Sequence, residues 1–251
     1  MTRTLVVVTT YNERENLPSL VDEVFAHAPQ VDLLVVDDNS PDGTGAWVRE
    51  RATGEPRLKL LARPGKQGQG SAVVAGLRYS IEHGYDAVVS MDADFSHHPR
   101  YIRDLLAGLE GDAAADVVIG SRYVPGGGVE GWPLRRRLMS RAVNVYTRLM
   151  LGLRARDCSG GFRAYRVARL AQLDFSQIIS TGYSFHEEFL WRVKRLGCRI
   201  AETPIVFVDR VKGHSKINMH EARTAVRVIF KLGLQNRFGR KPDCDRSRRG
   251  D

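Results

Sequence analysis

The sequence predicts an α/β protein built on a mostly parallel, doubly wound sheet. Short apolar runs that suit buried strands alternate with segments of helical periodicity through the first half of the chain. Clusters of polar residues follow four of these apolar runs. Because ligands of such sheets bind at the carboxyl ends of the strands, we expect the four clusters to form one site.

The elements of the first half follow in chain order. Asn16 precedes the first helix, Gly68 and Gly70 open the third, and Pro99 precedes the fourth. The expected strands are Thr4–Thr9, Leu33–Val36, Leu58–Ala62, Ala87–Met91 and Val117–Gly120. The expected helices are Leu17–Ala28, Gly45–Thr53, Ser71–His83 and Tyr101–Leu109. Such alternation is typical of a parallel sheet with helices on its faces.

The alternation stops after the glycines at 126–128. Beyond them, two long segments are expected to be helices and two short ones strands: Pro133–Gly152, Asn218–Phe238, Ile200–Ala201 and Ile205–Val208. A single domain is therefore expected over residues 1–238. The polar, basic residues 239–251 are expected to form a disordered tail.

Bulk properties narrow the class of protein. The chain has 251 residues, of which 43% are apolar, enough for a sizeable core. Its 38 basic and 29 acidic residues give a net charge of +9, which predicts an anionic partner. The 3 cysteines have neither disulfide-framework nor zinc-site spacing. With no signal-peptide pattern and no membrane-spanning apolar run, a cytoplasmic protein, in solution or on a membrane surface, is expected.

The most informative pattern is Asp92-Ala93-Asp94 at the end of the expected fourth strand. Side chains alternate along a strand, so both carboxylates point the same way. They would repel each other unless a cation lay between them, and Mg²⁺ binds one or two carboxylates together with substrate phosphate. A solvated acidic turn is the alternative. Polar clusters at the three other strand ends, beginning at Thr9, Asp37 and Ser121, favour the binding site.

Two further patterns bear on the ligand. Asp37 and Asp38 could accept hydrogen bonds from a base or a ribose, although residues 39–44 also suit a turn and a helix cap. The first strand is not followed by G-x-G-x-x-G, which argues against a dinucleotide-binding dehydrogenase. The glycine-rich segment 65–71 lacks P-loop order and is interpreted as a flexible loop near the ligand.

Arginines are concentrated in the second half of the chain, and arginine suits bidentate recognition of phosphate. Arg136 and Ser140 lie four residues apart, hence on one helix face, and could bind one phosphate. A solvated basic face is the alternative. The same helix has an apolar stripe, which suits either a membrane interface or core packing.

The segment 208–216 is a polar, cationic loop with a glycine hinge, which could close over bound phosphates. His97, His98 and His214 lack the spacing of metal ligands. His98-Pro99 more simply starts the next helix, so no histidine is given a catalytic role.

Taken in order, these segments resemble glycosyltransferase family 2, and within it the dolichol-phosphate and polyprenol-phosphate mannose synthases. The resemblance runs from about residue 4 to residue 238. Ser-His-His-Pro at 96–99 and the loop at 209–216 point to the mannose synthases in particular. The matching segments are Thr9–Leu17, Val36–Thr44, Met91–Pro99, Gly120–Tyr123, Gly160–Tyr165 and Val208–Arg210.

The resemblance implies a GT-A fold with a nucleotide-sugar half (residues 1–125) and an acceptor-binding half (126–238). It implies GDP-mannose as donor, a polyprenyl phosphate as acceptor and Mg²⁺ or Mn²⁺ as cofactor. It also implies peripheral binding to the cytoplasmic face of a membrane, with a possible separate membrane-anchor protein and no role for nucleic acid.

Site residues are carried over onto matching positions of this sequence. Asp94 and Arg122 are the expected catalytic residues. Around guanosine the resemblance places Thr9, Tyr11, Glu13, Val36 and Asp38. At the diphosphate and metal it places Asp92, Ala93 and Asp94, with Ser96 where some relatives have a Gln that helps to hold the metal. At the acceptor phosphate it places Arg122, Arg136 and Ser140, and on the loop that closes over the donor Arg210 and Lys216.

The implied reaction inverts the anomeric carbon, with a phosphate oxygen as nucleophile. The second pKa of a phosphate monoester is about 6, so the nucleophile is already anionic near neutral pH and needs no general base. Three alternatives stay open. They are transfer from UDP-glucose, a metal-dependent phosphatase with Asp92 as nucleophile, and a nucleic-acid-binding protein. The last would not explain four polar strand ends.

Overall fold

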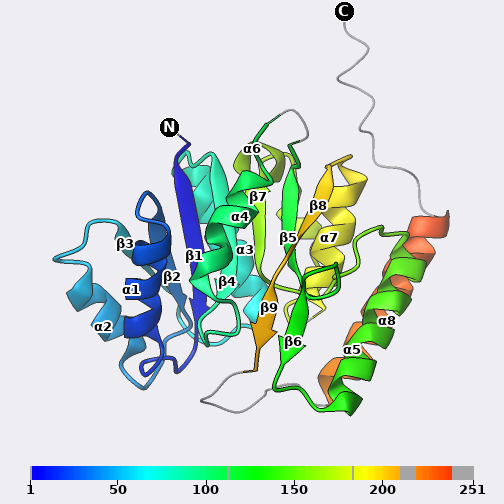
Figure 1. Ribbon diagram of the computed structural model, residues 1–251, viewed down its shortest axis with the longest axis horizontal. Helices are drawn as coiled ribbons and strands as arrows, with labels where there is room; N and C mark the ends of the chain where they lie inside the picture. The colour runs from blue at the N-terminus through cyan, green and yellow to red at the C-terminus, as the bar shows by residue number, and fades with distance from the viewer. Residues whose placement is uncertain (1, 112–113, 183, 210–218, 239–251) are drawn as a thin grey trace, which may run out of the picture.

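The computed structural model describes residues 2–111, 114–182, 184–209 and 219–238. Within them, seven strands form one sheet in the order β3-β2-β1-β4-β7-β5-β8 (Figure 1). All neighbours are parallel except β7, which is antiparallel to both β4 and β5. The strands are β1 (Thr4–Thr10), β2 (Asp32–Asp37), β3 (Leu58–Ala62), β4 (Ala87–Asp92), β5 (Val117–Ser121), β7 (Arg163–Arg166) and β8 (Ile200–Pro204). The expected mostly parallel α/β sheet is confirmed.

Helices cover both faces of this sheet, as Figure 1 shows. The α-helices are α1 (Leu17–His27), α2 (Thr44–Arg51), α3 (Gln69–Glu82), α4 (Ile102–Ala107), α5 (Leu134–Leu151), α6 (Val167–Leu170), α7 (Phe185–Arg195) and α8 (Met219–Phe238). Two 3₁₀ turns, η1 (Pro99–Tyr101) and η2 (Phe175–Gln177), and a small parallel sheet of β6 (Gly128–Glu130) and β9 (Val206–Val208) complete the described elements.

The alternation of side chains along β1 divides the core into two layers. Leu5 and Val7 pack into the layer covered by α3 and α7. Val6 and Val8 pack into the opposite layer, which is covered by α1 and α4. A strand that is buried on both faces must be apolar at every position, which is why the run Leu5–Val8 predicted it.

The register of the parallel strands aligns their carboxyl ends. Thr9 of β1 lies opposite Val36 of β2 on one side and Asp92 of β4 on the other. Thr10 lies opposite Asp37. Three of the expected polar clusters therefore begin at the same edge of the sheet.

The sequence did not predict β6, β7, α6, η2 or α7. The antiparallel strand β7 reads Arg-Ala-Tyr-Arg, and its Arg163 is fully buried, so no apolar run marks it. Helix α7 buries His186, Glu187 and Glu188 in its first turn, which hides its apolar periodicity. The expected helix Tyr101–Leu109 is a 3₁₀ turn followed by a shorter α-helix, with other boundaries shifted by one to three residues.

At one end of the molecule, α5 packs against α8 (Figure 1). In the part of the chain that the structure describes, no helix combines the length and apolarity that crossing a membrane requires.

Candidate active site

The site is built on three turns that follow β1, β2 and β4. In each turn one residue other than glycine has a positive φ: Asn12 (62°), Asn39 (57°) and Phe95 (61°). Among the described residues no other non-glycine residue does. Left-handed backbone of this kind costs free energy, most of all for a bulky side chain such as that of Phe95, and it clusters at functional sites. The strained positions mark the edge at which the sequence placed the site.

Asp37 is a structural residue of the turn after β2. Its buried carboxylate accepts hydrogen bonds from the Thr10 hydroxyl (2.9 Å) and from the backbone N–H (3.0 Å) and hydroxyl (2.5 Å) of Ser40. This is the turn chemistry that the sequence left open as an alternative. It fixes the backbone from which the next residue extends.

Asp38 is buried beside the positive charge of Arg63, which follows β3. The two side chains form an ion pair at 2.9 Å, and the backbone N–H of Gln67 donates to the Asp38 carboxylate at 3.3 Å. Burial raises the pKa of Asp38, and Arg63 opposes that shift. Arg63 and the Gln67 N–H therefore hold the Asp38 carboxylate in place at the end of β2, where it could accept a hydrogen bond from a base or a ribose.

The turn after β1 carries Tyr11 and Glu13. The ammonium of Lys66 lies 4.8 Å from the centre of the Tyr11 ring, so the glycine-rich segment reaches this turn. The Glu13 carboxylate accepts a hydrogen bond from Asn16 (2.8 Å), and its backbone N–H donates to Thr44 (3.2 Å). Glu13 thus connects the turn with the starts of α1 and α2.

Thr9, Val36 and Ala93 lie at this edge through their backbone positions. Val36 and Ala93 are buried in the two core layers, whereas Thr9 is half-buried. Any contact of Val36 or Ala93 with a ligand would be made by main-chain groups.

Asp92 and Asp94 are held in one tight turn at the end of β4. The Gln69 amide donates to Asp92 Oδ1 at 2.7 Å, and Ser96 donates to Asp94 Oδ1 through its backbone N–H (3.1 Å) and hydroxyl (2.5 Å). The Asp92 backbone N–H donates to His97 Nδ1 at 3.0 Å, which closes the turn. Burial lowers the pKa of His97, in keeping with an unprotonated Nδ1.

The donor set of this turn suits a hard divalent cation. Both aspartates are half-buried, and the Asp92 side chain keeps about a third of its surface exposed (32%). The Ser96 hydroxyl is buried against Asp94, so it orients that carboxylate. Mg²⁺ and Mn²⁺ prefer carboxylate oxygens as ligands, and these two carboxylates can be reached from solvent. Water and phosphate would complete the coordination.

Arg122, at the end of β5, is bound to a buried aspartate. Its Nε and Nη2 donate to the two carboxylate oxygens of Asp157, both at 2.7 Å, and Nη2 also donates to Ser159 at 2.8 Å. Burial alone would raise the pKa of Asp157, but Arg122 holds it below its usual value. A fork-to-fork pair of this kind fixes the guanidinium in one orientation.

Arg136 and Ser140 lie on the first half of α5, as expected, but each has a protein partner. Arg136 donates to Asp209 at 2.8 Å and lies over the Trp132 ring, 4.1 Å from its centre. The Ser140 hydroxyl accepts a hydrogen bond from Tyr123 at 2.6 Å. Trp132 lies between Arg136 and Arg122, since the Arg122 guanidinium is 5.5 Å from the Trp132 ring centre. Ser140 is connected to the same region through Tyr123, the neighbour of Arg122 in sequence.

A cavity of about 550 Å³ opens beside Arg122. Four arginines line it, contributed by the end of β5, by α5 and by the loop after α5: Arg122, Arg141, Arg148 and Arg156. Only Arg122 is paired with a buried carboxylate among the described residues of this lining. The cavity is therefore a positively charged pocket of a size that suits a phosphate group and the start of its substituent.

Behind the pocket lies a buried polar network centred on Arg163. Its guanidinium donates to three carbonyl oxygens, those of Gly160 (2.7 Å), Cys158 (2.7 Å) and His186 (2.8 Å). Glu187 is also buried there, and its Oε2 has no hydrogen-bond partner among the described residues. Burial raises the pKa of Glu187 to about 7.

Sequence reasoning missed the partners that hold the predicted residues. These are Arg63 on Asp38, Gln69 on Asp92 and Asp157 on Arg122. Gln69 lies in the glycine-rich segment 65–71, which is expected only to form a flexible loop near the ligand, and Asp157 lies just before the matching segment Gly160–Tyr165. Arg210, Lys216, His214 and the tail 239–251 lie outside the described residues.

Comparison with known proteins agrees with this geometry. The sequence profile of "Glycosyl transferase family 2" matches residues 5–173, more than half of the chain. The chain belongs to this family.

Two family 2 relatives match this chain over nearly its whole length. A "Polyprenol monophosphomannose synthase" of Mycolicibacterium smegmatis is 44% identical over 239 residues, which are 95% of this chain and 89% of the relative. An "Undecaprenyl-phosphate mannosyltransferase" of Micrococcus luteus is 44% identical over 236 residues, 94% of this chain and 96% of the relative.

Among solved structures, the mannosyltransferase PcManGT from Pyrobaculum calidifontis in complex with GDP-Man and Mn²⁺ shares the fold, with a TM-score of 0.60 and 19% identity. The match covers 96% of this chain and 66% of that structure. The resemblance to a GT-A fold, which the sequence implied, is confirmed.

The buried Glu187 predicts a pH-dependent stability. Its pKa is higher in the folded chain than in an unfolded one, so it stabilises the fold below pH 4 and this contribution is lost as the pH rises toward 7. Glutamine does not ionise, so the variant Glu187→Gln does not lose stability in this way as the pH rises. We expect the free energy of unfolding of the variant, relative to the parent, to rise by on the order of 3 kcal/mol between pH 4 and pH 8.

Urea denaturation at several pH values measures this difference. Glu50→Gln, at an exposed position of α2, is the matched control for removing a carboxylate that water already solvates. A difference between Glu187→Gln and the parent that is the same at every pH would show that the pKa of Glu187 is the same in the folded and the unfolded chain, and would contradict the prediction.

Proposed function

We propose that this chain transfers mannose from GDP-mannose to a polyprenyl monophosphate, with inversion of the anomeric carbon. One observation carries the proposal: the chain is 44% identical, over 94–95% of its length, to two proteins named for mannosyl transfer to polyprenyl phosphates. The two halves of the site suit the two substrates of that reaction.

The first half suits the donor. Asp38 would accept hydrogen bonds from the nucleoside, with Tyr11 and Glu13 beside it on the turn after β1. Asp92 and Asp94 would hold Mg²⁺ or Mn²⁺ at the diphosphate, where the ion would neutralise the charge that develops on the GDP leaving group. Arg210 and Lys216 are proposed to belong to the loop that closes over the donor.

The second half suits the acceptor. The described contacts of Arg122 with Asp157 and Ser159 use Nε and Nη2, so the guanidinium is held with its remaining nitrogen available to a phosphate oxygen. Arg141, Arg148 and Arg156 supply positive charge in the same pocket. Arg136 and Ser140 would reach a phosphate by exchanging their contacts with Asp209 and Tyr123.

The chemistry needs no protein nucleophile. A phosphate oxygen of the acceptor forms the new bond to the anomeric carbon while the bond from that carbon to GDP breaks. The acceptor is already largely a dianion near neutral pH, so no side chain has to remove a proton from it. The arginines would fix its position for in-line attack, which lowers the entropic part of the barrier.

The paired helices α5 and α8 suit contact with a membrane surface, where a polyprenyl chain would lie. Helix α5 contains five arginines and no acidic residue, and α8 also has exposed basic side chains. Exposed apolar side chains form a stripe on each helix: Leu134 (71%), Leu138 (57%), Val145 (51%) and Leu149 (78%) on α5, and Val226 (49%), Phe230 (52%) and Leu234 (45%) on α8. A basic, amphipathic surface of this kind binds anionic lipid.

Transfer of radiolabelled mannose from GDP-mannose to a short polyprenyl phosphate tests the reaction. We expect labelled lipid with Mg²⁺ or Mn²⁺, none with EDTA, and recovery when either ion is restored. Asp94→Ala should lower turnover about a hundredfold or more, because it removes a ligand of the ion that would neutralise the charge of the leaving group. Asp104→Ala, at an exposed position of α4, should retain activity.

Labelling that persists in EDTA, or a fully active Asp94→Ala, would contradict the proposed role of the metal. If UDP-glucose competed more strongly than unlabelled GDP-mannose, UDP-glucose would be the donor instead of GDP-mannose. Release of free phosphate from simple esters would favour a phosphatase instead.

Sedimentation with phospholipid vesicles tests the membrane surface. Leu138→Glu combined with Phe230→Glu should weaken binding to anionic vesicles about tenfold or more, because it removes apolar area and adds negative charge. Ile179→Glu changes an equally exposed apolar residue outside these helices and should bind as the parent does. Equal binding by all three proteins would exclude α5 and α8 as the contact.

A further inference from the structure

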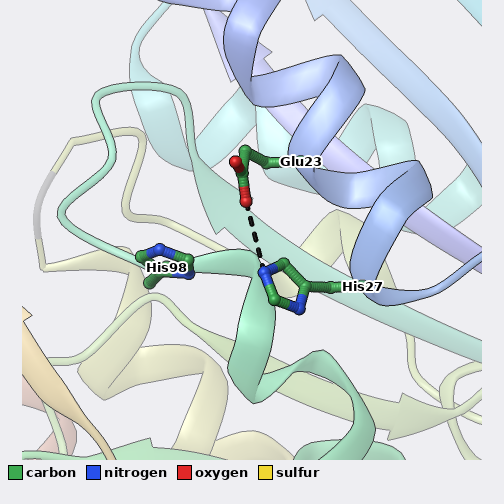
Figure 2. A group of neighbouring side chains, drawn as sticks. All are labelled: Glu23, His27 and His98. Atoms are coloured by element: carbon green, nitrogen blue, oxygen red, sulfur yellow. Dashed lines mark ion pairs between the residues drawn. The ribbon is translucent and has the colours of Figure 1, made fainter.

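A group of potential metal ligands lies outside the site described above. Glu23 and His27 are one turn apart on α1, and His98 precedes η1 (Figure 2). One ligand atom from each of the three residues lies within 4.8 Å of the other two. It is the one group of at least three His, Cys, Asp or Glu ligands at such distances within the described residues.

The three side chains are held together by the fold. Helix α1 packs against η1, which brings His98 to His27 across about seventy positions of sequence. The two imidazole rings meet edge to face, with centroids 5.6 Å apart at an angle of 74°. Glu23 Oε2 lies 3.2 Å from His27 Nε2, the contact drawn as a dashed line in Figure 2.

All three residues are half-buried. Their mobility is thus restricted, yet an ion from solvent can reach them. Ligand atoms around a tetrahedral zinc ion lie roughly 3.4 Å apart, because each is about 2.1 Å from the metal. Small side-chain rotations would bring these three to that spacing.

The donor types select the kind of ion. Two imidazole nitrogens and one carboxylate oxygen form a set that zinc binds in proteins, with a fourth position left to water. Mg²⁺ and Ca²⁺ prefer oxygen ligands, as Asp92 and Asp94 offer, and bind imidazole poorly. The two places on this chain therefore differ in the ions that they favour.

Binding would replace two weak contacts, one at each histidine. A neutral imidazole has a single nitrogen with a free lone pair, and in His98 it is Nδ1, which accepts a hydrogen bond from the backbone N–H of Arg100 at 3.2 Å. An ion must either replace that N–H at Nδ1, or take Nε2 after the ring proton moves to Nδ1. At His27 the ion would come between Nε2 and Glu23 Oε2, which lie 3.2 Å apart. A metal–nitrogen bond outweighs such exposed hydrogen bonds.

We propose that Glu23, His27 and His98 bind a borderline divalent transition ion, best matched by Zn²⁺, at a site separate from the Asp92–Asp94 pair. The bound ion would tie α1 to the segment that leads from Asp94 to His98. Because that segment also forms the turn around the two aspartates, the ion would stabilise the turn on which the diphosphate side of the active site is built.

Calorimetric titration of the full-length chain with Zn²⁺, in excess Mg²⁺ to occupy the oxygen site, tests the proposal. We expect one equivalent of Zn²⁺ to bind and to raise the melting temperature. His27→Ala and Glu23→Gln should each weaken binding about tenfold or more and abolish the thermal shift. His83→Ala removes an exposed histidine at the end of α3 and should bind as the parent does.

Asp94→Asn distinguishes the two places. It should leave the binding of Zn²⁺ unchanged, since Asp94 does not belong to the group. The proposal would be overturned if the parent bound no Zn²⁺, if His27→Ala bound it equally well, or if Asp94→Asn abolished binding. The first two outcomes would leave Glu23 and His27 as a surface ion pair.

Discussion

The parallel register of β1 with β2 and β4 is the constraint on which the rest of the site depends. It sets Thr9 beside Val36 and Asp92, so that three turns leave the sheet at one edge. Each turn then contains a left-handed residue, and each is closed by its own hydrogen bonds, from Ser40 to Asp37 and from Ser96 to Asp94 among others. The buried, two-layered core holds this register, because a slip by one residue would exchange the side chains of the layers.

Around Arg122, a buried ionic network has the equivalent role. The antiparallel strand β7 brings Arg163 into the interior, where its three hydrogen bonds to carbonyl oxygens fix the chain around residues 158–160 and the start of α7. Asp157 in turn orients Arg122. Removing one partner of such a buried pair typically costs about 3–5 kcal/mol, because the other charge is left uncompensated. The orientation of the Arg122 guanidinium, which faces the pocket, is therefore stabilised by the same buried contacts that stabilise the fold.

Most of the sheet and the polar turns after β1, β2 and β4 could be predicted from the sequence, since both follow from local patterns. Apolar runs mark strands that are buried on both faces, and the spacing of Asp92 and Asp94 places both carboxylates at a strand end. Strand β7, helix α7 and the group of Glu23, His27 and His98 could not be predicted in this way. Arg163 and Glu187 are polar residues whose burial depends on distant partners, and His27 meets His98 only after α1 has packed on η1. Asp157 and Gln69 were missed for the same reason, because each acts through a residue far away in sequence.

The central claim is that the turn after β4 holds a divalent ion against the diphosphate of the donor. Diffraction at the manganese absorption edge, from crystals grown with Mn²⁺ and GDP, tests it most directly. The account predicts an anomalous peak within coordination distance of Asp92 or Asp94 and of the GDP diphosphate. A well-defined GDP whose diphosphate lies away from both carboxylates, with no such peak between them, would contradict it.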